Sequence, residues 1–92
     1  MVKESKLQTR IRKHLEAEGW DVNKRIVMSK NGYEDLECFK FPGRAMFIEV
    51  KADNKKPDPL QEYWINRHVE MGFVSFFANS FEMFIEKYSY KL

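Results

Sequence analysis

The sequence is poor in cysteine, in charge of one sign and in long apolar runs. Its single cysteine, Cys38, excludes a framework of intrachain disulfides. The first residues, MVKESKLQTR, lack the uninterrupted apolar run of a signal peptide or a membrane span, so we expect an intracellular, cytoplasmic protein without a membrane partner. The formal net charge of +2 is too small to indicate nucleic-acid binding by itself.

What the chain does contain is enough apolar material for one small core. Its 92 residues are 43% hydrophobic and include eight Phe, four Tyr and two Trp. A chain of this length buries more than half of the surface that it exposes when unfolded, so we expect a single domain over residues 1–92, without internal repeats or linkers. The aromatic content is sufficient to fill the core and to leave an apolar patch for a second copy.

Periodicity and capping signals predict helices in three places. Apolar residues recur every four positions from Leu7 to Leu15, and Gly19 follows as a stop. Asp58 and Gln61 have the spacing of a capping box at the start of a second helix. The expected helices cover residues 3–18, 59–71 and 81–88.

Strands are expected between these helices, over residues 20–29, 36–41, 45–51 and 73–78. The last is a nearly continuous apolar run and is expected in the interior of the sheet. The elements follow the order α-β-β-β-α-β-α, which predicts an α/β fold with a small central mixed sheet flanked by helices.

The two middle strands are joined by Pro42-Gly43-Arg44, and the length of this loop decides which side chains share a face. A loop of two residues would place Asp35 and Glu49 on opposite faces. A loop of three residues, or of five, places Asp35 across from Lys51 and Glu37 across from Glu49. We choose the odd length because it leaves the apolar residues for the core. The carboxylates then crowd one face, and such a face is stable only when a cation neutralises it.

These elements carry a set of short motifs: Glu4 on the first helix, Gly32-x-x-Asp35 before a strand, Glu49-x-Lys51 on the next strand, and Gln61 at the start of a helix. Glu-x-Lys alone occurs by chance in many proteins. In this order and spacing the motifs resemble the PD-(D/E)XK nuclease superfamily, and most of all its VRR-NUC branch, the virus-type replication-repair nucleases. The resemblance covers nearly the whole chain and implies a restriction-endonuclease-like core.

The chain departs from the family pattern at Glu34, which stands where the family usually has a proline before the first aspartate. That proline is not a metal ligand, so we expect its loss to alter the loop entering the strand without removing the site. As the neighbour of Asp35 on an extended chain, Glu34 is expected to point to the other face.

The resemblance implies hydrolysis of phosphodiester bonds with Mg²⁺ or Mn²⁺ as the cofactor. Carboxylate oxygens suit these hard ions, and Asp35 and Glu49 are the expected ligands. The family pattern adds the backbone carbonyl of Val50 as a third ligand. Lys51 is expected, again by resemblance, to orient or activate the attacking water near the phosphate.

Two further residues are expected in the site, each with a structural alternative. Glu4 falls inside the apolar arc of the first helix, where a carboxylate needs a partner, and would hold a metal-associated water or a second ion. A glutamate in a first turn is also favoured by the helix macrodipole. Gln61 would position water or phosphate, but it also completes the capping box.

Standalone members of this family are similar to Holliday-junction resolvases, which work as symmetric dimers. We therefore expect a homodimer that cleaves branched DNA, such as four-way junctions or flaps. The virus-type relatives also allow a virus-encoded protein that acts in the host cell. The residues expected to contact DNA phosphates are Lys3, Lys6, Arg10, Lys13, Lys55 and Lys56.

Other interpretations remain open at this stage: a restriction-type nuclease for linear DNA, a noncatalytic DNA-binding or assembly module with the same fold, and a protein-interaction domain with solvated carboxylates. His14 is expected at the boundary of the core, and His68 lies mid-helix without a partner at metal-ligand spacing. Cys38 is expected to be a small core residue, and Trp64 to lie in the core or at a subunit interface.

Overall fold

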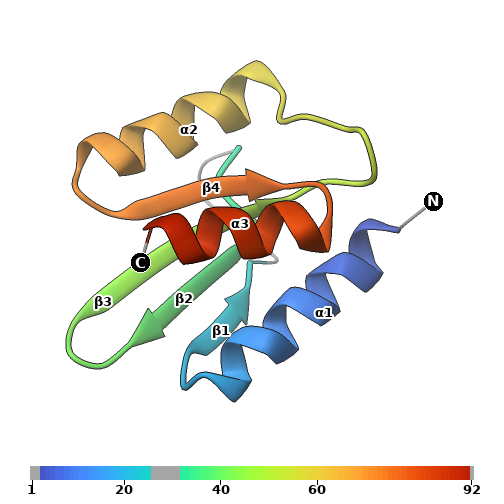
Figure 1. The fold of residues 1–92 in the computed structure, drawn as a ribbon. Coiled ribbons are helices and arrows are strands. Elements are labelled where there is room, and N and C mark those ends of the chain that lie inside the picture. The colour runs from blue at the N-terminus through green and yellow to red at the C-terminus, as the bar shows by residue number, and fades with distance from the viewer. Residues whose placement is uncertain (1–2, 26–31, 92) are drawn as a thin grey trace.

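The computed structural model describes residues 3–25 and 32–91, and the elements follow the predicted order (Figure 1). They are α1 (Glu4–Ala17), β1 (Asp21–Lys24), β2 (Leu36–Lys40), β3 (Arg44–Val50), α2 (Pro59–Glu70), β4 (Val74–Ala78) and α3 (Phe81–Lys91). The far part of the first predicted strand and the turn at residues 30–31 lie outside the described residues. No helix in the described ranges is long and apolar enough to cross a lipid bilayer.

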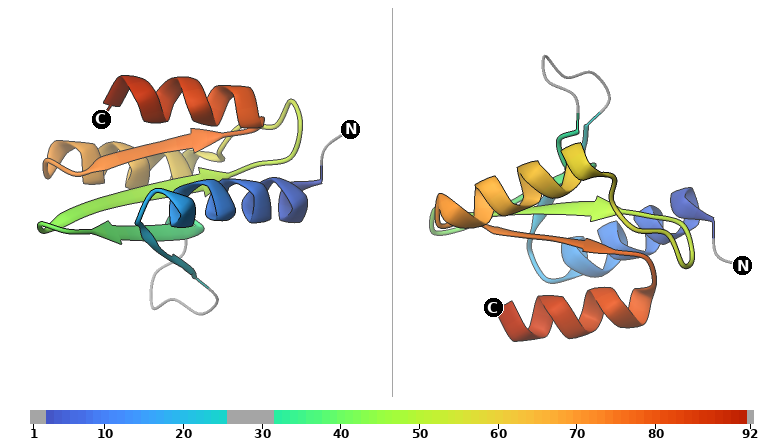
Figure 2. Two further views of the ribbon diagram at one scale, coloured as in Figure 1. Left: turned by 60° about the horizontal axis from the view of Figure 1, so that its bottom comes forward. Right: turned by 90° about the horizontal axis from the view of Figure 1, so that it is seen from above.

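The strands form one mixed sheet in the order β1-β2-β3-β4. The first three pair antiparallel, and β4 pairs parallel with β3. The prediction that residues 73–78 lie inside the sheet is wrong, because β4 is an edge strand of the described sheet. Its apolar run has another cause: helices α2 and α3 cover its two faces (Figure 2).

Helices α1 and α3 lie on one face of the sheet, and α2 lies on the other (Figure 2). The main core fills the space between the sheet, α1 and α3. Leu7, Ile11 and Leu15 supply its α1 side, as their spacing predicts, and Met46 and Ile48 come from β3. The face of β3 that looks toward α2 is therefore free for ionisable residues.

The free edge of β4 is covered by a charged side chain from α3. Lys51 N–H donates to the Ala78 carbonyl at 3.0 Å, so the polar groups of the preceding residue, Phe77, point away from β3. Lys87 Nζ donates to the Phe77 carbonyl at 2.7 Å, and its ammonium lies 3.9 Å from the Phe77 ring centroid. Burial lowers the pKa of this lysine.

The hairpin between β2 and β3 has a loop of three residues, between the paired ends of the two strands. Glu37 therefore pairs with Phe47, and the register places Asp35 opposite Glu49. The expected partners, Glu49 for Glu37 and Lys51 for Asp35, belong to a loop centred on Gly43. They are wrong by two residues, because the observed loop is centred on Pro42. A shift of two keeps every side chain on its predicted face, so the division into an apolar and an ionisable face is confirmed.

Candidate active site

The candidate site lies at the carboxyl end of β3, on the side of the molecule that also holds the first turn of α1 and the start of α2 (Figure 1). Glu49 is the second-last residue of β3 and alternates with the core residues Ile48 and Val50, so it faces α2. Its side chain is buried, at 2% exposure, and its Oε1 has no hydrogen-bond partner among the described residues. A buried carboxylate oxygen without a partner is costly unless something binds it.

Asp35 immediately precedes β2 and reaches across to β3. Its Oδ2 accepts a hydrogen bond from the Val50 N–H at 2.9 Å, so a side chain takes the place of the next backbone bond of the ladder. The preceding turn depends on Gly32, whose φ is +85° and where a Cβ atom would lie 2.6 Å from Leu60 Cγ. The Gly32-x-x-Asp35 motif therefore delivers Asp35 beside Glu49.

The two carboxyl groups share a poorly solvated site. Burial raises the pKa of Glu49 to about 8, and the neighbouring charge of Asp35 adds to the rise. Burial also raises the pKa of Asp35, against the opposing effects of the Val50 hydrogen bond and of Lys51. Two carboxylates in one site resist simultaneous ionisation, so an added cation would stabilise the ionised pair.

In the absence of metal, the free energy of unfolding is expected to fall as the pH rises from about 4.5 to about 8. Over this range the folded protein keeps the Glu49 proton that the unfolded chain releases, so the folded state binds more protons. The loss from this group is at most about 1.4 kcal/mol per pH unit. Urea unfolding in EDTA at several pH values measures it, and Glu49→Gln should lack this contribution. If the free energy of unfolding changes with pH in the same way in the native protein and in Glu49→Gln, burial does not raise the pKa of Glu49.

Lys51 is the first residue after β3, and its Nζ donates to Gln61 Oε1 at 3.3 Å. The same oxygen accepts the Asp58 N–H at 2.9 Å, and the Asp58 side chain accepts the Gln61 N–H. The capping box predicted at the start of α2 is therefore confirmed. Gln61 caps the helix and holds Lys51 with one atom, while its part in catalysis stays a prediction.

Glu4 is the first residue of α1 and is exposed, so its expected position on the buried side of the helix is wrong. The apolar stripe contacts the sheet only from Leu7 onward. Glu4 still lies close enough for its charge to raise the pKa of both Asp35 and Glu49. The Glu4 carboxylate therefore lies near enough to Asp35 and Glu49 to act on them through its charge.

A buried polar cluster adjoining the site was not expected from the sequence. Glu34 is fully buried, and its Oε2 lies 2.7 Å from His68 Nδ1 and accepts the Ser75 hydroxyl at 2.5 Å. The contact with His68 places Glu34 on the α2 side of the sheet, which Glu49 also faces, so the prediction that Glu34 points away from this face is wrong. The charge of Glu34 also raises the pKa of Glu49. The available signal was the position of His68 three residues after Ile65, on the buried stripe of α2, because a buried imidazole needs a partner.

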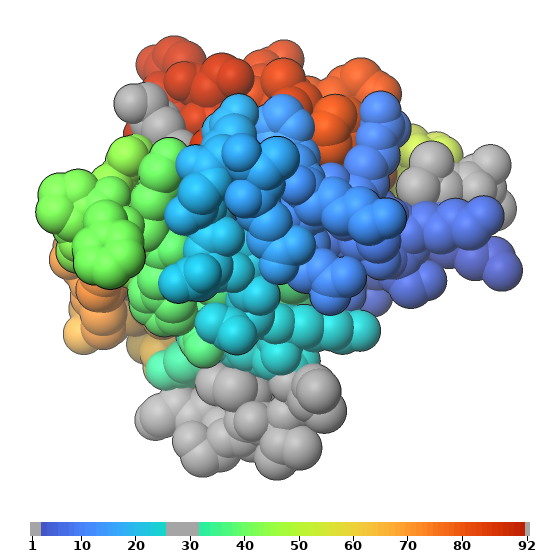
Figure 3. Space-filling view, turned by 90° about the horizontal axis from the view of Figure 1, so that it is seen from below, coloured from blue at the N-terminus to red at the C-terminus, as the bar shows by residue number. Residues whose placement is uncertain are grey.

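The basic residues expected to contact DNA are all exposed. Those on α1 lie along the helix that crosses the face shown in Figure 3. Arg10 is held against α3, with its guanidinium carbon 3.9 Å from the Phe81 ring centroid. Lys55 and Lys56 lie on the loop between β3 and α2, at the same end of the molecule as the N-terminus of α1 (Figure 2).

A solved structure described as "VRR_NUC domain" superposes on this chain with a TM-score of 0.79 and 32% sequence identity. The match covers 89% of this chain and 89% of that chain. The chain belongs to the VRR-NUC family. No protein-family model and no curated protein matches it. The VRR-NUC assignment makes the chain a nuclease domain, in agreement with the resemblance seen in its motifs.

The other side chains considered for chemistry in this VRR-NUC domain pack in the core or at its boundary. Cys38 is fully buried, and burial raises the pKa of its thiol to about 12, as fits a core residue. His14 lies at the boundary of the core, as expected, with Nε2 3.4 Å from the Glu18 carboxylate and its ring edge-on to Phe84. Trp64 is partly buried and packs against Tyr33, so it belongs to the α2 side of the fold.

Proposed function

We propose that this VRR-NUC domain is a metal-dependent DNA endonuclease that hydrolyses phosphodiester bonds in branched DNA, such as four-way junctions or flaps. The observation that carries the proposal is the convergence of Asp35, Glu49 and Lys51 at the carboxyl end of β3 in a chain of a nuclease family. Two carboxylates beside a lysine supply the charges that phosphodiester hydrolysis requires.

The residues at this site fit a divalent cation of the Mg²⁺ type. Within residues 3–25 and 32–91, no group of three or more His, Cys, Asp or Glu side chains is placed to hold a metal ion. Mg²⁺ does not need one, because it keeps several waters and binds through one or two carboxylates. Asp35 and the unpartnered Oε1 of Glu49 would be those ligands. The Val50 carbonyl suits a third position, because it points to the same side as the Val50 N–H, toward Asp35.

Bound there, Mg²⁺ or Mn²⁺ would supply Lewis acidity toward the phosphodiester and activate water. Lys51 would place its positive charge beside the reacting phosphate and orient the attacking water. Gln61 would hold Lys51 in this position through the bond that joins them. Glu4, at the mouth of the site, would hold a water molecule or a second ion.

Affinity for DNA is proposed to come from phosphate contacts by the exposed basic residues on α1 and on the loop before α2. A homodimer is proposed because a four-way junction presents two equivalent strands for cutting. Its support is the exposed apolar side chains of α2 and of the segment that follows. They are Leu60, Tyr63, Val69, Met71 and Phe73.

A cleavage assay on four-way junction, flap and linear duplex DNA tests this function. The protein is expected to cut the branched substrates in Mg²⁺ or Mn²⁺ and to be inactive in EDTA, and Asp35→Asn is expected to be inactive in all conditions. Cutting that persists in EDTA and in Asp35→Asn would refute the proposed chemistry. DNA binding without cutting would favour the noncatalytic module, and equal cutting of all three substrates would refute the preference for branches.

Mn²⁺ is expected to raise the melting temperature of the native protein, because an ion that binds only the folded state stabilises it. At a concentration of about 100 times the dissociation constant the gain is about 2.7 kcal/mol. Glu49→Gln should show a much smaller rise, since it loses the buried carboxylate oxygen without a partner. Exposed Glu62→Gln on α2 serves as the control and should respond like the native protein. Equal shifts in all three proteins would count against a site at Glu49.

A further inference from the structure

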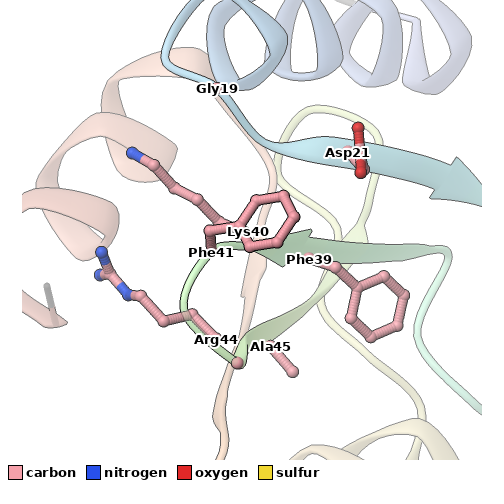
Figure 4. A pocket seen from close by; sticks show the side chains of 8 residues that line it. Gly19, Asp21, Phe39, Lys40, Phe41, Arg44 and Ala45 are labelled. Atoms are coloured by element: carbon pink, nitrogen blue, oxygen red, sulfur yellow. The ribbon is translucent and has the colours of Figure 1, made fainter.

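The β2–β3 hairpin carries a pocket at the opposite end of β3 from the candidate active site (Figure 1). Its volume is about 470 Å³, within the range of about 300 to 1,000 Å³ that is common for sites of small organic groups. The hairpin stands at the edge of the molecule in Figure 3, beside α1 and α3. The residues that matter for its chemistry are Asp21, Phe39, Lys40, Phe41 and Arg44 (Figure 4).

Two phenylalanine rings of this pocket are open to solvent. Phe41 is 91% exposed and Phe39 is 41% exposed. In the part of the chain that the structure describes, neither ring packs against another aromatic ring. Exposed rings on a hairpin offer flat apolar surfaces on which nucleobases of any sequence can stack.

Two cations adjoin Phe41 on the Trp20 side of the hairpin, which is the face opposite to that of Phe39. Lys40 and Arg44 pair across the hairpin, and both lie over the ring of buried Trp20, with charged atoms 5.7 Å and 5.4 Å from its centroid. Neither forms an ion pair within residues 3–25 and 32–91. Trp20 holds the two side chains in place, which lowers the entropy lost when they bind an anion. Asp21 is the carboxylate of the pocket and can accept hydrogen bonds from base amino groups.

We propose that the hairpin pocket binds an unpaired DNA strand, with bases stacked on Phe39 and Phe41 and phosphates bound by Lys40 and Arg44. The choice of DNA rests on the proposed nuclease function. Phe39 and Asp35 lie four positions apart on one extended strand, so their side chains leave the same face of the sheet. One substrate can therefore contact both the pocket and the candidate active site.

The length of β3 sets the expected spacing between the two sites. Arg44 and Lys51 are separated by seven residues, which span about 23 Å of extended chain. An unpaired strand whose bases stay stacked as in a duplex advances about 3.4 Å per nucleotide, so at most about seven nucleotides are needed to cover this distance. An unpaired tail shorter than this spacing should not reach the pocket from a duplex end that is placed at the cutting site.

Fluorescence anisotropy in EDTA tests the proposal without cleavage, with a blunt duplex and with duplexes that carry tails of about 3 and about 12 nucleotides. The native protein is expected to bind the long-tailed duplex at least about 10-fold more tightly than the other two DNAs. Phe41→Ala and the double variant K40A/R44A should lose this advantage and keep their affinity for the blunt duplex. Tyr90→Ala is the matched control, because Tyr90 is 89% exposed on α3 and is not among the residues that line the pocket.

Three results would overturn the proposal. Equal native affinity for blunt and long-tailed DNA would show that the pocket does not bind unpaired strands. An equal loss for both DNAs in Phe41→Ala would make the hairpin part of a duplex-binding surface. A change in oligomeric state in Phe41→Ala would make it a contact between copies. If the protein prefers long-tailed DNA but does not cleave DNA in Mg²⁺ or Mn²⁺, the proposed nuclease function is refuted and the proposed binding by the hairpin is not.

Discussion

Lys51→Ala is expected to lower the rate of DNA cleavage at least about 100-fold, the usual cost of removing a positioned charge from a reacting group. Lys51 lies beside Asp35 and Glu49, and Gln61 holds its ammonium at 3.3 Å. Its side chain is only partly buried, so the melting temperature should change little. Single-turnover cleavage with excess protein separates this loss of rate from a loss of DNA affinity.

The matched control for Lys51→Ala is Lys56→Ala, which removes the same charge from an exposed position on the same loop. It should weaken DNA binding modestly, with little effect on the rate at saturating protein. A native cleavage rate in Lys51→Ala, or equal losses in the two variants, would show that Lys51 acts only as a general phosphate contact.

His68→Ala is expected to lower the free energy of unfolding by about 3 to 5 kcal/mol, because it leaves the buried carboxylate of Glu34 without its main partner. Among the residues that the structure describes, the Ser75 hydroxyl alone would remain bound to that carboxylate. For a domain of this size the melting temperature should fall by at least about 10 °C. Urea unfolding or calorimetry in EDTA measures the change apart from any effect of metal.

The control on the same helix is Asn66→Ala, an exposed position where the change should stay within about 0.5 kcal/mol. A double-mutant cycle with Glu34→Gln isolates the interaction between the two buried groups, and a coupling of at least about 1 kcal/mol is expected. Additive effects of Glu34→Gln and His68→Ala would mean that the pair contributes only through packing.

Local patterns were sufficient to predict the elements and the faces of the sheet. The four-residue spacing on α1, the capping box at Asp58 and the alternation along β3 each depend on residues close together in the chain. The same alternation placed Asp35, Glu49 and Lys51 on one face before any contact was known. These parts of the candidate site were therefore accessible from sequence.

The rest depends on contacts between distant segments. The apolar run of β4 shows that both faces of the strand are covered, but not whether the strand lies at an edge of the sheet. Its place in the sheet was therefore wrongly predicted. Hairpin register also depends on which residue lies at the centre of the turn, and this turn is centred on Pro42, one residue earlier than expected. Glu34 and Ser75 are 41 positions apart, and no periodicity links such residues.

The lysine at the margin of β4 has a consequence for self-association. An open strand normally invites sheet extension by a neighbouring molecule, the route to domain swapping and fibril growth. Here the Phe77 carbonyl is already engaged by the Lys87 ammonium, so an incoming strand would have to displace a charge that is bound in place. Two copies of this domain are therefore not expected to join their sheets through β4, and on this side of the molecule we expect contacts between copies to involve helix side chains.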